Sequence, residues 1–205
     1  MANVTNVKSK FFGAVDGLDA DGISTTASIS GAAALTINGT LTSGGSYTSG
    51  DNIGQLITIT SAGDDTGITF TIVGTDAVGD AQTEVVTGAN TTVATSSGYF
   101  NTVASITTSA SSAAAVTAGV TGTGTGTVFA GRTRIRGLQG LSGASAGNLL
   151  FKNTSVTGTT LLTVPTQAAA GLIEPYIPDN AVLFDAGAYV NFGSAVATVT
   201  VFYDG

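Results

Sequence analysis

The chain has 205 residues, with 13 acidic and 6 basic side chains, a formal net charge of -7, and no His, Cys or Trp. This composition lacks the commonest general base, the thiol nucleophile and the usual nitrogen and sulfur metal ligands, so we expect neither an enzyme nor a bound cofactor. So few cations on an acidic chain also argue against nucleic-acid binding, which needs clustered Lys and Arg.

Residues 1–30 predict an extended N-terminal arm. Glycines and aspartates are mixed there without a sustained hydrophobic period, so we expect the arm to depend on neighbouring elements for its order. Lys8 and Lys10 precede only two bulky apolar residues, Phe11 and Phe12, and this is too short for the apolar core of a secretory signal. The apolar runs of the chain are also too short to span a bilayer, so we expect no membrane association.

Residues 31–120 predict a first small β-sandwich. Apolar and polar residues alternate with a period of two around Leu35–Leu41, Ile57–Thr60 and Ile68–Val73, which is typical of strands with one buried face. Further strands are expected over Gln82–Thr87, Tyr99–Thr108 and Ala114–Val120. The Gly- and Asp-rich segments 63–67 and 76–80 are each expected to close a hairpin.

The segment 121–127 alternates strictly between Thr and Gly and has no large side chain to pack. We interpret it as a linker between two domains, with a poorly twisted edge strand as the alternative.

Residues 128–205 predict a second β-sandwich or jelly-roll-like domain with its own apolar core. The fold class is therefore all-β, with two small domains preceded by the arm, and no helix is predicted. The expected strands of this half are Val128–Leu138, Asn148–Thr154, Thr159–Val164, Leu172–Ile177, Val182–Phe184, Ala188–Phe192 and Val196–Tyr203. Pro175 and Pro178 exclude the segment around them from the centre of a sheet.

The arginines of the chain are Arg132, Arg134 and Arg136, placed two residues apart in a strand-like segment. In a strand this spacing puts all three on one face. Guanidinium groups bind carboxylates in a bidentate manner, so the row suits docking on an acidic partner surface. The alternative is a solvated outer face of an edge strand, where charges deter aggregation.

The acidic run Asp16–Gly22 resembles a calcium loop only in part. When Asp19, Asp21 and Gly22 are aligned on that pattern, Gly17 and Ser28 occupy two of the strongest ligand positions. We therefore predict no metal site.

Two parts of the chain resemble segments of virion proteins of tailed bacteriophages. The first is IGQLITITSAGDDTGITFTIVGTD at Ile53–Asp76, continuing at Gln82–Gly88. The second combines Gly158–Thr163, Tyr176–Pro178, Val182–Phe184 and Ala197–Tyr203.

This resemblance implies a non-enzymatic phage structural protein, most similar to capsid decoration (cement) proteins or to head fibres and knobs. Its partners would be the major capsid protein and further copies of itself, and a trimer would suit three-fold lattice positions. Such a protein is made in the host cytoplasm and lies on the capsid exterior of the virion. The resemblance also implies attachment through the arm and the arginine row, with Lys8, Lys10, Phe11, Phe12, Arg132, Arg134 and Arg136 as the candidate docking residues.

Two other functions remain open from the sequence. A tail, baseplate or fibre component would share this composition, although a fibre usually has a long repetitive shaft that is absent here. A carbohydrate-binding adhesin would need exposed aromatic side chains. Without Trp, the candidates for that role are Tyr47, Tyr99, Tyr176, Tyr189 and Tyr203.

Overall fold

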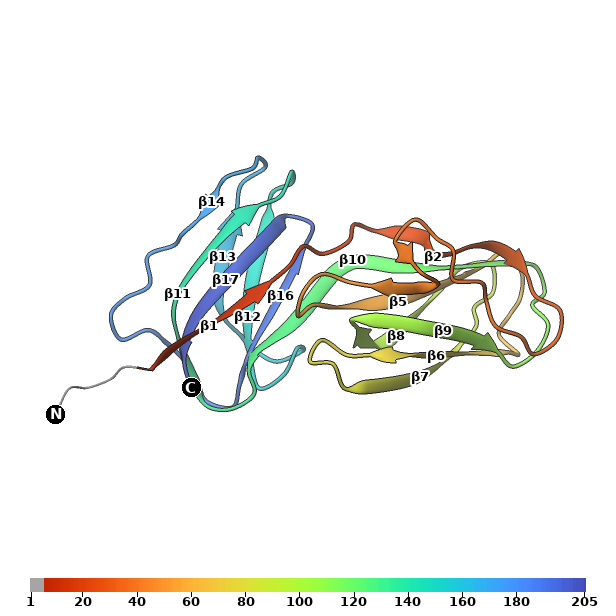
Figure 1. Cartoon of the computed structure of the whole chain (residues 1–205), viewed down its shortest axis with the longest axis horizontal. Coiled ribbons are helices and arrows are strands. Elements are labelled where there is room, and N and C mark those ends of the chain that lie inside the picture. The colour runs from red at the N-terminus through yellow and green to blue at the C-terminus, as the bar shows by residue number, and fades with distance from the viewer. Residues whose placement is uncertain (1–5) are drawn as a thin grey trace. The chain divides into compact units, whose positions relative to one another are not determined.

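The computed structural model describes residues 6–205 and contains seventeen strands and no helix over that range (Figure 1). The predicted all-β class is confirmed. The strands form three hydrogen-bonded sheets, so several separate ladders hold the chain.

The described chain divides into two compact units. Unit 1 contains residues 6–15, 51–53 and 124–205, and unit 2 contains residues 16–50 and 54–123. The boundary after Thr123 lies inside the predicted linker 121–127. The division of residues 6–30 between the two units was not predicted, and residues 1–5 of the expected arm lie outside the described residues.

Unit 1 is built from two groups of strands whose apolar side chains form one core. The first group follows the order β1-β17-β11-β14, with β15 also paired to β11. The second group is β13-β12-β16 together with the C-terminal end of β10. Their bounds are β1 Val7–Phe12, β10 Ala115–Phe129, β11 Thr133–Ser142, β12 Gly147–Asn153, β13 Thr160–Thr166, β14 Leu172–Ile173, β15 Val182–Phe184, β16 Ala188–Gly193 and β17 Val196–Asp204. Buried side chains from both groups, such as Phe151, Val190 and Val201, belong to one apolar cluster.

Unit 2 has the same kind of organisation around a second core. A five-stranded sheet follows the order β3-β4-β9-β6-β7, and the other strands are β2, β5, β8 and the N-terminal part of β10. Their bounds are β2 Asp19–Ser28, β3 Thr42–Ser43, β4 Ser46–Thr48, β5 Gly54–Ser61, β6 Thr69–Thr75, β7 Ala81–Thr87, β8 Val93–Phe100 and β9 Thr102–Thr108. Inward residues of both groups, including Ile57, Ile59, Phe70 and Ile72, are fully buried in this core.

Residues 6–30 do not form a free arm. β1 pairs antiparallel with β17 in unit 1, and β2 pairs antiparallel with β10 in unit 2. β1 and β2 are therefore ordered by pairing within a sheet. This agrees with the prediction that residues 1–30, which lack a sustained hydrophobic period, depend on neighbouring elements.

The Thr-Gly segment 121–127 lies within β10 and is not a free linker. Its glycines have a packing role, because a Cβ at Gly126 would lie 2.5 Å from the ring of Phe12. Thr125 is buried and donates its hydroxyl to the Val190 carbonyl at 2.8 Å. The segment is therefore a strand, as in the alternative of a poorly twisted edge strand, but β10 lies between β16 and β5 in its sheet.

One of the two predicted hairpins is present. β6 and β7 form a regular antiparallel pair around residues 76–80. Residues 63–67 instead lead from β5 into a different sheet, because β5 and β6 are not partners. The buried Asp65 fixes this crossing, since its backbone amide donates to the Ala89 carbonyl and its carboxylate accepts from the Ala113 amide.

Three predicted strands are shorter or divided. Residues 99–108 break at Asn101 between β8 and β9, and residues 128–138 break at 130–132 between β10 and β11. The strand expected at 172–177 stops after Ile173, close to Pro175, which cannot donate to a ladder.

Glu84 joins the edges of two sheets in unit 2. β8 carries two extra residues opposite β5 between Thr95 and Tyr99, which turns the amides of Ser97 and Gly98 away from the ladder. The Glu84 carboxylate accepts from these amides at 2.7 and 2.8 Å and from the Ser97 hydroxyl at 2.9 Å. A side chain of β7 thus satisfies backbone donors that the bulge leaves without a strand partner.

A buried polar cluster fixes the start of unit 2. The Tyr47 hydroxyl lies 2.9 Å from Asp16 Oδ2 and 3.0 Å from Gln55 Oε1, and the Gln55 amide donates to the Asp16 carbonyl. Burial raises the pKa of Asp16, an effect that the hydrogen bond from Tyr47 only partly offsets. Burial also raises the pKa of Tyr47, so this hydroxyl stays protonated.

We predict that Glu84→Ala lowers the free energy of unfolding by about 1 to 2 kcal/mol, because it leaves two bulge amides without an acceptor. Glu84→Gln should cost less, since one amide oxygen still accepts. Urea denaturation measures both, with Thr83→Ala on the exposed side of β7 as the control. Equal stability of Glu84→Ala and the control would contradict this role.

We predict that Asp16 makes unit 2 less stable as the pH rises through its titration. The pKa of Asp16 in the folded state lies above its ordinary value of 3.8, so protonation of Asp16 stabilises the folded state. This stabilisation is complete at pH values below 3.8 and is lost as the pH rises through the raised pKa. Asp16→Asn should remove this contribution. The difference in unfolding free energy between wild type and Asp16→Asn should therefore fall across that window and then stay constant, as urea titrations at several pH values would measure.

Candidate functional site

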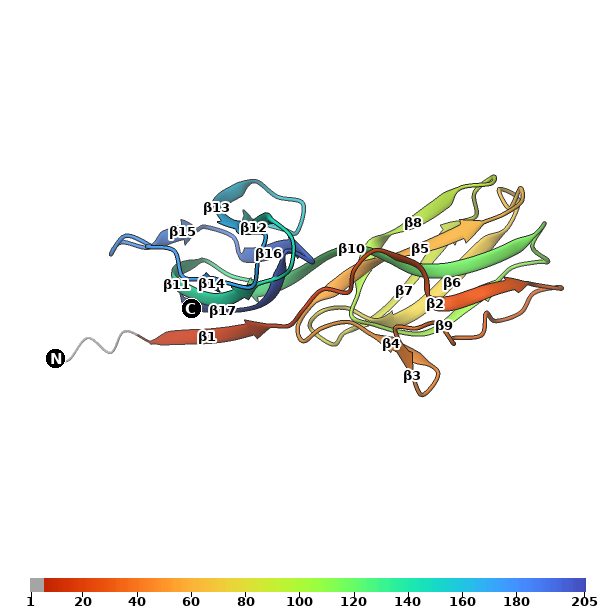
Figure 2. The same cartoon turned by 90° about the horizontal axis from the view of Figure 1, so that it is seen from above.

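The structure brings the two separated groups of predicted docking residues onto one sheet. β17 lies between β1 and β11, so strands from the two ends of the chain run side by side (Figure 2). Val7 is opposite Asp204, and Asp204 is opposite Arg134 on its other side. Residues directly opposite share a face, so this row places the β1 and β11 segments on the same surface.

The outward face of β1, β17 and β11 carries exposed apolar side chains. Val7 is 47% exposed, Phe11 42% and Phe202 36%. Phe202 is opposite Ser9 on one side and Gly137 on the other. We call this surface, defined by Val7, Phe11, Phe202, Arg134 and Arg136, the docking face.

Sequence reasoning missed Val7 and Phe202. A signal for Phe202 was present in the alternation of its strand, because Val199, Val201 and Tyr203 are buried and parity then places Phe202 outward.

Three of the predicted docking residues lie on the other side of β1. Phe12 is fully buried in the core of unit 1, so its side chain is not available to a partner. Lys8 and Lys10 are opposite the buried Tyr203 and Val201, and their amines lie 5.9 Å from the ring centres of Phe129 and Phe12. Burial lowers the pKa of Lys10.

These lysines have a consequence for assembly. β1 is the edge strand of its sheet, and inward-pointing charges on an edge strand discourage the addition of a further strand. Docking through the exposed edge of β1 is therefore less favourable than docking through the outward face.

The three arginines differ in how many of their guanidinium N–H groups have a partner. Arg136 donates from Nε to Asp204 Oδ2 at 2.6 Å and from Nη1 to the Asp179 carbonyl at 3.0 Å, and its Nη2 forms an ion pair with Asp204 Oδ2 at 2.6 Å. Hydrogen bonding to Asp204 raises the pKa of Arg136. Among the described residues, Arg134 makes one side-chain hydrogen bond, from Nη1 to the Asn180 carbonyl at 2.6 Å. Arg136 therefore fixes the segment before β15 to β11, whereas Arg134 keeps free donors.

Arg132 precedes β11 and lies in the turn after β10. Its Nε is 3.8 Å from Asp185 Oδ1, and both side chains are about 70% exposed (68% and 73%). An exposed pair at this distance contributes little to stability. Arg132 is therefore the most accessible of the three cations.

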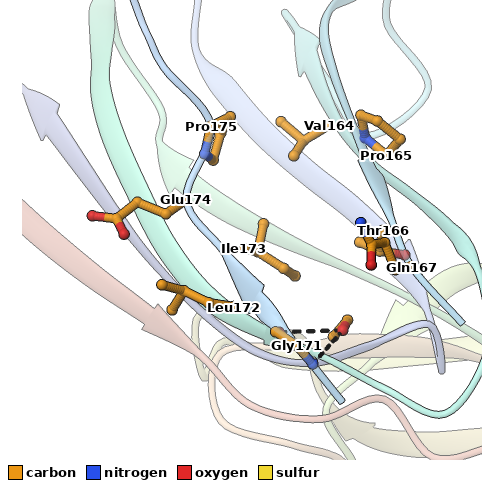
Figure 3. A pocket seen from close by; sticks show the side chains of 10 residues that line it. Val164, Pro165, Thr166, Gln167, Gly171, Leu172, Ile173, Glu174 and Pro175 are labelled. Carbon is orange, nitrogen blue, oxygen red and sulfur yellow. Dashed lines mark hydrogen bonds between the residues drawn. The ribbon is translucent and has the colours of Figure 1, made fainter. Parts of the chain in front are cut away.

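A hollow of about 300 Å³ lies elsewhere in unit 1, between β13 and β14 (Figure 3). Val164 and Ile173 face each other across it, with Pro165 and Pro175 at its sides. Glu174 is its one charged lining residue, and its side chain points away from Ile173 and Val164 (Figure 3). The hollow is thus lined by polar and apolar groups in similar measure, and its lining holds no pair of acid and base groups.

The tyrosines considered for sugar binding do not form an exposed platform. Tyr47 and Tyr203 are buried, Tyr99 and Tyr189 are partly buried, and Tyr176 is 86% exposed. The acidic run also does not converge, because Asp16 contacts Tyr47 whereas Asp19 accepts from the Asp21 amide and the Thr40 hydroxyl. Within residues 6–205 there is no group of three acidic residues placed to hold a metal ion.

Comparison with known proteins gives no relative: no protein-family model, curated protein or solved structure matches the chain. In the described part of the chain, no helix has the length and apolar character needed to cross a bilayer.

We predict that the neighbouring phenylalanines Phe11 and Phe12 of β1 differ strongly in their contribution to stability. Phe12→Ala should lower the free energy of unfolding by about 3 to 5 kcal/mol, because it leaves a cavity in the core of unit 1. Phe11→Ala should cost clearly less, about 1 kcal/mol or below, since 42% of the residue is already exposed to solvent. Thermal and urea denaturation of the two variants measure the difference, and a large loss of stability in Phe11→Ala would contradict the assignment of Phe11 to the surface.

Proposed function

We propose that the chain is a non-enzymatic structural protein of a tailed-phage virion, a capsid decoration or cement protein that binds and stabilises the major capsid lattice. The observation that carries the proposal is the docking face, where exposed Phe11 and Phe202 lie on the same face of the sheet as Arg134. Aromatic and arginine side chains dominate the binding energy of many protein interfaces. Charge complementarity favours an acidic surface of a coat subunit as the partner.

The architecture is consistent with this role. We take each unit as a small β-sandwich, whose inward side chains form a core while the outer faces stay available for contacts. The chain has no Cys, so sheet ladders and packing replace disulfides as the source of rigidity. Binding to a lattice, and to further copies of the chain, would add stability by mass action.

The resemblance of Ile53–Asp76 and Ala197–Tyr203 to phage virion segments supports the same proposal. In this role the protein lies on the capsid exterior after synthesis in the host cytoplasm. Its partners are the major capsid protein and copies of itself, with a trimer as the oligomer that three-fold lattice positions would favour.

Quantitative mass spectrometry of purified particles tests the proposal. We expect the protein in intact virions at a copy number that rises with that of the coat protein. A few copies per particle would instead indicate a tail or baseplate component, and absence from virions would contradict both.

A charge-reversal pair tests the docking face. Arg134→Glu should abolish or strongly reduce binding to capsids, because it places a carboxylate opposite an acidic partner. Lys152→Glu makes the same change of charge in β12, away from this face, and should bind as wild type does. Co-sedimentation with capsids lacking the protein measures both. Equal binding by the two variants would exclude this face as the contact.

A further inference from the structure

A second, smaller hollow lies at the arginine end of the docking face. It has a volume of about 220 Å³ and is lined by Arg132, Thr133, Arg134, Leu183, Asp204 and Gly205. β11 begins here, and Arg134 is opposite Leu183 in the adjacent β15. All of these residues belong to unit 1.

Within residues 6–205, the guanidinium donors without a hydrogen-bond partner gather at this hollow. A guanidinium has five N–H donors. Arg136 uses Nε, Nη1 and Nη2 within unit 1 and does not line the hollow. Over the range that the structure describes, Arg134 uses one nitrogen, and the partner of Arg132 is Asp185, whose Oδ1 lies 3.8 Å from Nε and so beyond hydrogen-bond distance. The two arginines with unused donors are therefore the two that line the hollow.

The acidic groups nearby leave room for an added anion. Arg136 balances the charge of Asp204 through Oδ2, whereas the buried Oδ1 of Asp204 has no hydrogen-bond partner among the described residues. Asp185 is 73% exposed, so solvent screens its interaction with Arg132. Leu183 supplies an apolar wall, which reduces the competition from water for a bound group.

We propose that this hollow is a carboxylate-binding site, in which Arg132 and Arg134 together grip one carboxylate of a partner protein. A planar carboxylate matches the fork of a guanidinium and accepts two parallel N–H bonds from it. A carboxylate is also the anionic group that the Asp and Glu side chains of a partner protein supply. That the carboxylate belongs to a coat subunit rests on the proposed function, whereas the site itself does not.

The test is a titration of the full-length protein with acetate, followed by NMR at the arginine Nε–H groups. The chain has only three arginines, so three signals report on the whole set, and Arg136 is an internal control. At constant ionic strength set with chloride, we expect saturable shifts at Arg132 and Arg134 and a smaller shift at Arg136. Equal, non-saturating shifts at all three arginines would overturn the proposal.

Two variants and a second anion sharpen the test. Arg134→Lys keeps the charge but loses the fork, and should weaken acetate binding by about tenfold. Lys152→Gln removes a cation away from the hollow and should leave binding unchanged. Tighter binding of inorganic phosphate than of acetate would overturn the carboxylate assignment.

The titration and the virion experiment can fail separately. If wild-type protein shows no acetate binding, the carboxylate site is excluded while the presence of the protein in virions is still tested by the copy number. If the protein is absent from virions, acetate binding by the purified protein is unaffected.

Discussion

Pairing between the first and last strands of the chain is the interaction on which the candidate site depends. Six residues of β1 pair with β17, from Val7 opposite Asp204 to Phe12 opposite Val199. Phe12 is fully buried at the end of this ladder, where glycine at position 126 leaves space for its ring. Without this pairing, Phe11 would not lie on the same surface as Phe202 and the arginines.

One face of β1 contributes to the stability of unit 1, and the other face is exposed and could contact a partner. On the inward face, Phe12 packs in the core of unit 1. The amines of Lys8 and Lys10 on the same face lie over the rings of Phe129 and Phe12. Outward residues leave apolar surface in water, which is unfavourable unless a partner covers it. The same alternation that builds the strand thus produces a surface suited to binding.

Strand positions could be predicted in large part from the sequence, because the period of two reflects which side chains face a core. The β6–β7 hairpin is an example, since its turn residues lie between two alternating segments. Pairing between distant strands could not be predicted, because it depends on contacts between residues far apart in the sequence. The segment 63–67 has good hairpin chemistry, yet it crosses to another sheet where Asp65 finds its partners.

The sequence by itself determined the all-β class and the grouping of the cations at 132–136, because both follow from residue types at fixed local spacing. Only the tertiary structure decided which of these cations stay free. Asp204, Asp179 and Asn180 reach Arg136 and Arg134 from other segments of the chain, and no local pattern encodes that approach. It likewise decided that Phe12 is core and Phe11 is surface, because adjacent residues of a strand point to opposite faces and only the packed sheet fixes which face is inside.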